Sequence, residues 1–275
     1  MNIAIHYWNI IIFHAKRKDY AMKKTFIFLV SAMAFSMVLC GCTLFNGGIW
    51  PSTEIEVRRA MVPVEIDGKV TDEIWERSKF YPFSIPNDPD RLREWRNNRP
   101  YQEGTVQIAY DDQYVYVLAK LEDDDIVQYG ENGTHLYQRG DTFEFFLQNP
   151  VSGHYWEIYG SANGKSTVMF FENGGKRIFP EAIQKNDKIK VAVDVKGTLN
   201  NSKDNDKYFV VEMAIPMSII NSKGDFFKPG TSWNVLCARY NYSKSLFDLE
   251  LTSTSAAMPK ANWHDRKSYL PIVFR

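Results

Sequence analysis

The sequence has no excess of either charge and very little cysteine. Its 275 residues include 33 Lys and Arg and 33 Asp and Glu, so the formal net charge is zero. A nucleic-acid-binding protein needs a cationic excess that faces the phosphates, and this composition argues against nucleic acid as a partner. Three cysteines in a chain of this length exclude a scaffold held together by disulfides.

Long apolar runs and familiar enzyme motifs are also missing. No run reaches the roughly 18–20 residues that a membrane-spanning helix needs. The sequence lacks a glycine-rich phosphate loop, a Gly-x-Ser-x-Gly elbow, a His-Glu-x-x-His pair and paired CxxC motifs. These absences argue against the conventional catalytic sites. What the chain has instead is aromatic side chains, with 18 Phe, 15 Tyr and 7 Trp.

A segment near the N-terminus has the layout of an export signal. Lys23 and Lys24 follow Met22 and precede a mostly apolar stretch at residues 26–40. The stretch leads into a Leu-Cys-Gly-Cys sequence that resembles the bacterial lipobox, in which Cys42 is the residue that receives lipid. The alternative is an ordinary cleaved signal that leaves a spare thiol.

This signal divides the chain into four parts. We expect residues 1–21 to be a non-translated upstream extension and 22–41 to be a lipoprotein signal peptide. Residues 42–59 are then a lipidated N-terminus and tether, and 60–275 are a folded body long enough to bury a full core. The predicted location is the bacterial cell envelope, where the exported protein is lipid-anchored at the outer membrane or the cell surface.

The body is rich in strand patterns and poor in helix patterns. Apolar and polar residues alternate over 106–110 and resume over 114–120 after a polar turn, which is typical of a hairpin. An Ala-Asn-Gly turn at 162–164 separates two further strands, and short helices are expected only near 71–75 and 216–220. The predicted fold is all-β, an antiparallel β-sandwich of jelly-roll type with a few short helices. Further strands are expected at 142–147, 189–195, 208–215, 232–240 and 270–274.

Two groups of carboxylates were weighed for chemistry. Asp141 and Glu144 are three residues apart in a predicted strand, so they point to opposite faces and cannot act together on one glycosidic bond. A hydrolase would need a carboxylate from a distant segment. Asp123, Asp124 and Asp125 follow a strand and form either a solvated turn or part of a calcium site, although they lack the spacing of an EF-hand loop.

Aromatic residues in polar, loop-like sequence are candidate platforms for sugars, because the flat C–H face of a sugar ring packs well on Trp and Tyr. For each of them the alternative is packing in the core. Trp263 stands out, because polar residues flank it on both sides. The candidates are Trp95, Tyr101, Tyr137, Trp156 and Trp263.

Several segments, taken in order, resemble the family 9 carbohydrate-binding modules. The resemblance extends over about residues 60–275, and it implies a β-sandwich that binds sugars, often carries structural calcium and has no catalysis of its own. The segments are 66–69 with 72–75, 110–117, 140–147, 208–216, and 262–265 before a closing strand at 269–274.

The resemblance also implies site residues. The family holds the end of a sugar chain between two tryptophans, whose positions fall on Tyr137 and Trp263 in this sequence. Glu144 matches a family acid that hydrogen-bonds sugar hydroxyls, and Glu157 stands where the family has a sugar-contacting arginine. The candidate set is completed by two neighbours of these residues, Asn262 and Trp156.

The leading hypothesis is non-catalytic carbohydrate binding by a lipid-anchored envelope protein. Its partners are an oligosaccharide or polysaccharide end and, through the anchor, a membrane; the only cofactor considered is structural calcium. One alternative is a glycoside hydrolase that uses a distant carboxylate pair. Another is an assembly lipoprotein that has lost sugar binding.

Overall fold

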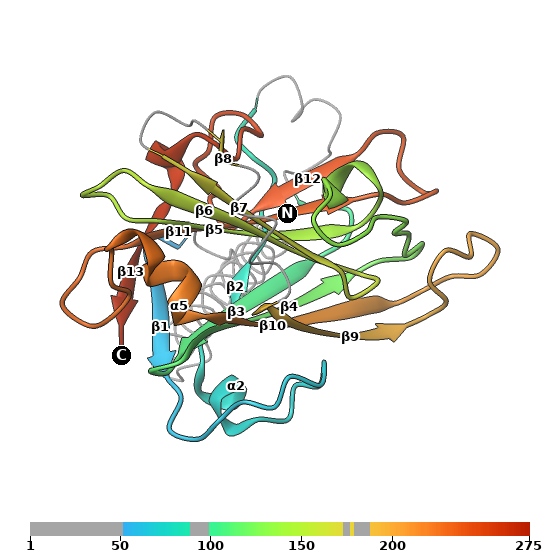
Figure 1. The fold of residues 1–275 in the computed structure, drawn as a ribbon. Coiled ribbons are helices and arrows are strands. Elements are labelled where there is room, and N and C mark those ends of the chain that lie inside the picture. The colour runs from blue at the N-terminus through green and yellow to red at the C-terminus, as the bar shows by residue number, and fades with distance from the viewer. Residues whose placement is uncertain (1–51, 89–98, 173–176, 179–187) are drawn as a thin grey trace, which may run out of the picture. The chain divides into compact units, whose positions relative to one another are not determined.

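The computed structural model describes residues 52–88, 99–172, 177–178 and 188–275 (Figure 1). All of them belong to one of the two compact units of the chain, Trp50–Arg275. The predicted upstream extension, the signal peptide and Cys42 lie outside the described residues, and so does Trp95.

The described chain is mostly β, as the sequence predicts. Its helices are α2 (Glu73–Arg77), α5 (Met217–Ile220) and the 3-10 turns η2 (Leu136–Gln138), η4 (Asn221–Lys223) and η5 (Arg266–Ser268). Helical pieces this short cannot cross a bilayer, and within the described residues no membrane-spanning helix is found. The strands are β1 (Ile55–Arg59), β2 (Tyr81–Pro82), β3 (Gly104–Tyr110), β4 (Tyr114–Glu122), β5 (Thr142–Gln148), β6 (Tyr155–Ser161), β7 (Ser166–Phe171), β8 (Arg177–Ile178), β9 (Lys190–Lys196), β10 (Tyr208–Pro216), β11 (Asn234–Asn241), β12 (Glu250–Ser253) and β13 (Leu270–Phe274).

The strands form one continuous, curved sheet. Its order is β8-β7-β6-β5-β11-β13-β1-β3-β4-β10-β9, with β12 added to β11 and β2 added to β3. The sheet curves through about 270° and is nearly closed, so its two ends face each other as layers (Figure 1).

The prediction of a purely antiparallel sandwich needs correction at β1. This strand lies parallel to both β13 and β3, whereas the other pairs among the described strands are antiparallel. Because β1 inserts between β13 and β3, it joins two antiparallel halves into one mixed sheet. Residues 55–59, which the sequence analysis assigned to the tether, therefore form the link in the middle of the fold.

The main core lies between the two layers. Phe143 on β5 and Gly160 on β6 are register partners, and a Cβ at Gly160 would lie 2.6 Å from the sulfur of Met213 on β10. The layers approach so closely here that only glycine fits at this position without rearrangement. The inward face of β5 and β6 is therefore the one that carries Phe143, and the alternate residues of these strands face outward.

The predicted hairpin and helices are confirmed. Asp111 closes the β3–β4 turn by accepting hydrogen bonds from the backbone N–H groups of Gln113 and Tyr114, both at 2.7 Å. Pro216 precedes α5, as expected for a helix start. At α2 the side chain of Asp72 makes no capping bond and instead accepts from the backbone N–H of Glu65 at 3.3 Å.

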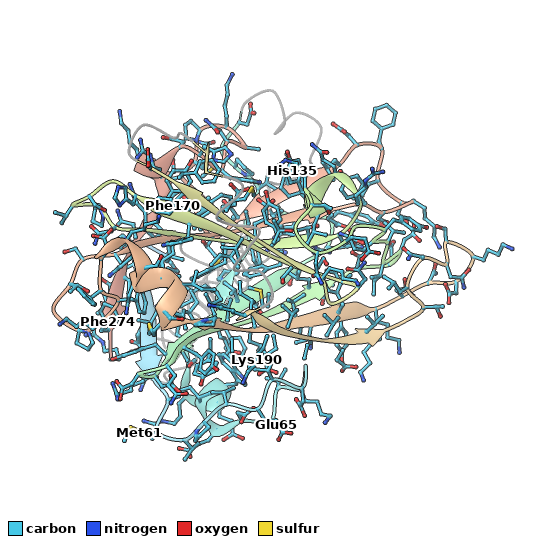
Figure 2. All side chains as sticks on the ribbon, in the orientation of Figure 1. Met61, Glu65, His135, Phe170, Lys190 and Phe274 are labelled. Carbon is cyan, nitrogen blue, oxygen red and sulfur yellow. The ribbon has the colours of Figure 1, made fainter. Side chains whose placement is uncertain are left out.

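The segment that contains α2 covers the other outer face of the sheet. It packs over Tyr116, Leu118 and Val210 of β4 and β10 through Ile74 and Trp75. Figure 2 shows its labelled residues Met61 and Glu65 on the side away from β5 and β6. The outward face of β5, β6 and β11 is therefore not covered by this segment.

Candidate functional site

The outward face of β5 and β6 carries two glutamates. Glu144 follows inward-facing Phe143 and therefore points outward. Its register partner on β6 is Tyr159, and Glu157 lies two residues before Tyr159 on the same face. The hydroxyl of Tyr159 donates a hydrogen bond to Oε1 of Glu157. Two neighbouring strands thus place two carboxyl groups and a phenol together.

Three aromatic rings complete this group. Tyr240 on β11 lies two residues after Ala238, the register partner of Glu144, and so shares its face. The ring of Tyr240 lies 4.9 Å from that of Tyr137 and 6.3 Å from that of Trp263, measured between centroids. We name the whole group the outer-face cluster: Tyr137, Glu144, Glu157, Tyr159, Tyr240 and Trp263.

The two predicted platforms differ in exposure. Tyr137 is half-buried in the middle of η2, on the loop where Figure 2 labels His135, and its ring also meets Tyr159 edge-on at 6.0 Å. Trp263 is only 4% exposed, and the hydroxyl of Tyr269 donates to its backbone carbonyl at 2.6 Å. The prediction of Trp263 as an open platform therefore needs correction, because its ring packs in the core, and Tyr137 is the one of the two that a ligand can reach.

Glu144 is buried in an unusual way. Its side chain is 1% exposed, and neither carboxyl oxygen has a hydrogen-bond partner within the described part of the chain. Burial raises the pKa of Glu144 well above its ordinary value, and the nearby charge of Glu157 raises it further. These surroundings favour the protonated form of Glu144, which has one O–H to donate and lone pairs to accept.

The phenol of Tyr159 responds to the same surroundings. Burial raises its pKa well above the usual range, and the charges of Glu144 and Glu157 add to the effect. These surroundings favour the protonated phenol, which donates the hydrogen bond to Glu157. The cluster combines neutral hydroxyl and carboxyl groups with aromatic surface, which suits a neutral, hydroxyl-bearing ligand better than an ion.

The remaining site candidates from the sequence lie apart from the cluster. Trp156 lies on the opposite face of β6 from Glu157, and its ring packs in the core 4.7 Å from that of Phe170. Asn262 is exposed beside Trp263, and its Oδ1 accepts the backbone N–H of His264 at 3.3 Å. The structure thus brings together four of the six predicted residues, leaves Asn262 at the rim and puts Trp156 in the core.

Tyr159 and Tyr240 were not predicted as site residues. The sequence assigns both to strands, but their face becomes known only when β5 is paired with β6 and β11. The pairing with β11 joins residues more than 80 positions apart, for example Gln148 and Asn234. Strand alternation combined with this register would have found them, whereas alternation alone could not.

The three aspartates proposed for calcium make separate contacts. Asp123 is fully buried against Arg239 at 3.1 Å, and burial raises its pKa to about 6 although the Arg239 charge opposes the shift. Asp124 accepts from the hydroxyl of Ser243, and Asp125 accepts from the backbone of Lys244. Within the described residues no group of three or more His, Cys, Asp or Glu is arranged to hold a metal. The calcium prediction gains no support from this part of the chain.

Similar proteins point to one family. Residues 66–270 match the carbohydrate family 9 binding domain-like family. A protein of Bacteroides uniformis ATCC 8492, described provisionally as carbohydrate-binding, superposes with a TM-score of 0.59 at 14% identity, over 81% of this chain and 99% of the other.

A second solved structure is the family 9 module of Caldicellulosiruptor kristjanssonii in complex with cellotriose. It superposes with a TM-score of 0.50 at 16% identity, over 81% of this chain and 93% of the module. No curated protein matches the chain significantly. The ordered motifs, the curved β-sheet and a match that extends over most of the sequence agree, and the chain belongs to the carbohydrate family 9 binding domain-like family.

Proposed function

We propose that this protein binds a saccharide without transforming it, at the outer-face cluster. The observation that carries the proposal is Glu144, a buried carboxyl group with two unpartnered oxygens, held among aromatic rings. A folded protein rarely leaves such a group unsatisfied unless something outside the chain satisfies it. Sugar hydroxyls both donate and accept, so they match a neutral carboxyl group.

The aromatic rings supply the second half of the recognition. We place the sugar on Tyr137 and on Tyr240, which are both half-buried and lie 4.9 Å apart between ring centroids. The second predicted platform, Trp263, is buried in the core and contacts the edge of Tyr240 instead. Aromatic contacts contribute about 0.5–1.5 kcal/mol beyond area burial, and a typical hydrogen bond contributes about 0.5–1.5 kcal/mol. After ordering costs, such a site gives affinities of about micromolar or weaker.

The family supports the saccharide class. Its modules are non-catalytic binding domains, and the Caldicellulosiruptor kristjanssonii module was solved with cellotriose. Cellotriose is therefore the first probe to try, within a panel that includes other soluble oligosaccharides and their monosaccharides.

Isothermal titration calorimetry with this panel tests the proposal. We expect Tyr137→Ala to weaken binding about tenfold, the loss of one aromatic platform. Glu144→Leu should abolish binding without lowering stability, because it removes oxygens that have no partner in the described protein and keeps a similar volume. The control is Phe80→Ala, which truncates an aromatic side chain that is 57% exposed and outside the cluster.

Either of two results would overturn the proposal. The first is that no glycan in a broad panel binds, which would favour the assembly lipoprotein that has lost its sugar site. The second is that binding survives unchanged in both Tyr137→Ala and Glu144→Leu, which would place the sugar elsewhere.

One observation favours a second candidate, a glycoside hydrolase. Such an enzyme needs two carboxyl groups at one site, and Glu144 and Glu157 lie on the same face of the neighbouring strands β5 and β6. Release of reducing sugar by the purified protein, lost in Glu157→Gln, would establish this activity. If the protein releases reducing sugar from none of the glycans that it binds, the hydrolase is refuted and only the binding function stands.

We also propose that the protein is a lipoprotein of a bacterial envelope, anchored through Cys42. The support is the sequence that resembles a lipobox directly after the apolar stretch. A membrane anchor holds many copies of a weak binder at one surface, and the resulting avidity compensates for the modest affinity of each site.

A further inference from the structure

A pocket lies in the hairpin loop that joins β11 to β12. Its volume is about 430 Å³, within the range of roughly 300–1,000 Å³ found for small-molecule sites. Leu246, Phe247 and Leu249 of the loop form one side, and Asp125 and Asn241 contribute polar groups from the body of the protein. None of these residues belongs to the outer-face cluster.

Two hydrogen-bond acceptors that line this pocket have no donor in the described chain. Asp125 and Asn241 are 4% and 0% exposed, and Oδ1 of each is buried with no hydrogen-bond partner within the described chain. The orientation of the Asn241 amide is fixed, because its Nδ2 donates to Oε1 of Gln102 at 2.7 Å and to Oε2 of Glu250 at 2.8 Å. Its Oδ1 must therefore accept from another source.

Donors of Lys244 and Ser243, which also line the pocket, make other hydrogen bonds in the described chain. The backbone N–H of Lys244 donates to Oδ2 of Asp125 at 2.8 Å, and its ammonium group donates to the carbonyls of Ser202 and Asp204. The hydroxyl of Ser243 donates to Asp124. Two buried acceptors without donors indicate a ligand that brings its own hydrogen-bond donors.

The loop side of the pocket is apolar and exposed. Phe247 is fully exposed at 106% of its reference area, although burial of a phenylalanine side chain is strongly favourable. An exposed aromatic beside buried acceptors provides a flat surface for a ring and polar groups at its edge.

The pocket is also connected to the proposed sugar site. Tyr242 lines it, and the hydroxyl of Tyr242 donates to the backbone carbonyl of Tyr137 at 2.6 Å. The side chain of one pocket-lining residue thus supports the loop that carries the main platform. This link favours one extended ligand over two unrelated ones.

From these observations we infer that the β11–β12 pocket is a second saccharide subsite. It takes a sugar unit whose hydroxyls donate to Asp125 and Asn241 while the ring packs on Phe247. This inference rests on the proposed function, and it extends that function from a single sugar unit to a longer chain.

Calorimetry with cellotriose, the other trisaccharides of the panel and their monosaccharides tests the subsite. Phe247→Ala should weaken the best trisaccharide about five- to tenfold and leave its monosaccharide within about twofold, because only the longer ligand reaches the loop. Asp125→Asn should have the same effect. The new amide oxygen keeps the hydrogen bond from the backbone N–H of Lys244, so the NH₂ group takes the place of the unpartnered Oδ1 and removes the acceptor from the pocket. Phe80→Ala is again the control.

Tyr137→Ala separates the failure of this inference from the failure of the proposed function. If Tyr137→Ala weakens both ligands while Phe247→Ala and Asp125→Asn bind the trisaccharide like the wild type, the subsite is refuted and the main site stands. If no sugar binds the wild-type protein, the subsite and the proposed saccharide-binding function are both refuted. If the pocket variants affect only glucosamine and not neutral sugars, the pocket takes an ammonium group and the saccharide inference is overturned.

Discussion

At the scale of single residues, Glu144 is buried in surroundings that do not satisfy its carboxyl group. Its carboxyl group is removed from water, lies near a second glutamate and makes no hydrogen bond within the described chain. Charging this group in the folded state is unfavourable, because both burial and the neighbouring charge favour the protonated form. Such a residue lowers stability near neutral pH, a cost that the proposed binding role would account for.

The first prediction concerns the pH dependence of stability. Because the folded-state pKa of Glu144 is raised above its ordinary value of 4.5, the folded protein holds a proton that the unfolded chain releases. The associated stability is fully present below pH 4.5 and is lost as pH rises toward the folded-state pKa. Glu144→Gln removes this loss, so its melting temperature should exceed that of the wild type at pH 7–8 and the difference should shrink toward pH 4.

Thermal unfolding followed by circular dichroism between pH 4 and pH 8 measures this effect. The matched control is Glu76→Gln, which neutralises an exposed glutamate on α2. Parallel melting curves for the wild type and Glu144→Gln across the whole range would contradict the raised pKa.

The second prediction compares two glycines. Both Gly68 and Gly224 have positive φ, at +79° and +87°, so alanine is strained at either position. A Cβ at Gly68 would lie 2.9 Å from the backbone carbon of Val193 on β9, whereas nothing lies within 4 Å at Gly224. Gly68→Ala should therefore destabilise the protein by at least about 1 kcal/mol more than Gly224→Ala in urea unfolding. Equal losses would show that the contact with β9 is unimportant.

At the scale of elements, Glu212 of β10 holds the α2 segment against the sheet. Its carboxylate accepts from the backbone N–H groups of Asp67 and Gly68, both at 3.0 Å, and from the indole of Trp75 at 2.9 Å. These donors belong to the segments at 66–69 and 72–75 that carry the family resemblance. The most recognisable part of the sequence is therefore structural and lies on the face of the sheet away from the outer-face cluster.

The third prediction follows from this arrangement. Glu212→Ala leaves three donors without their acceptor, and unsatisfied buried donors cost about 1–3 kcal/mol each. We expect a loss of about 3–5 kcal/mol in the free energy of unfolding and a red shift of the Trp75 fluorescence, with Phe80→Ala as a nearby control. A variant that unfolds like the wild type would show that the segment is held by its apolar contacts alone.

Much of the fold was predictable from strand periodicity, and the exceptions have physical causes. The β3–β4 hairpin and the helix after Pro216 follow from local signals in turns and caps. The parallel insertion of β1 does not, because Ile55–Arg59 is short, follows a polar segment and pairs with strands from distant parts of the chain. Local patterns contain no information about such pairings.

The site was predictable to a similar degree. The polar sequence around Tyr137 and Trp263 marks them as candidates, the family resemblance adds Glu144, and the structure places all three in one cluster. Trp156 was chosen because its sequence surroundings are polar, but alternation along β6 turns its ring into the core while Glu157 faces out. Tyr240 was missed because its position beside Tyr137 depends on the pairing of β11 with β5.

At the scale of the whole molecule, we propose that a lipid anchor acts together with a weak binding site. The fourth prediction is that the wild-type protein, expressed in a bacterium, fractionates with membranes and carries a diacylglyceryl group on Cys42. Cys42→Ser should remain as an unmodified precursor without the lipid mass. Cys40→Ser, two residues away, is the matched control and should be lipidated normally.

Mass spectrometry of the N-terminal peptide together with membrane fractionation decides the matter. A wild-type protein that is cleaved but carries no lipid would refute the anchor and favour the ordinary signal peptide. The proposed binding site would be unaffected, but avidity from a membrane anchor could no longer compensate for its modest affinity.

The most direct test of the central claim is a crystal structure of the protein with the tightest-binding glycan of the panel. The account predicts a sugar ring packed against Tyr137, with one of its hydroxyls hydrogen-bonded to a carboxyl oxygen of Glu144. A glycan bound away from the outer-face cluster, with both oxygens of Glu144 still unpartnered, would contradict it.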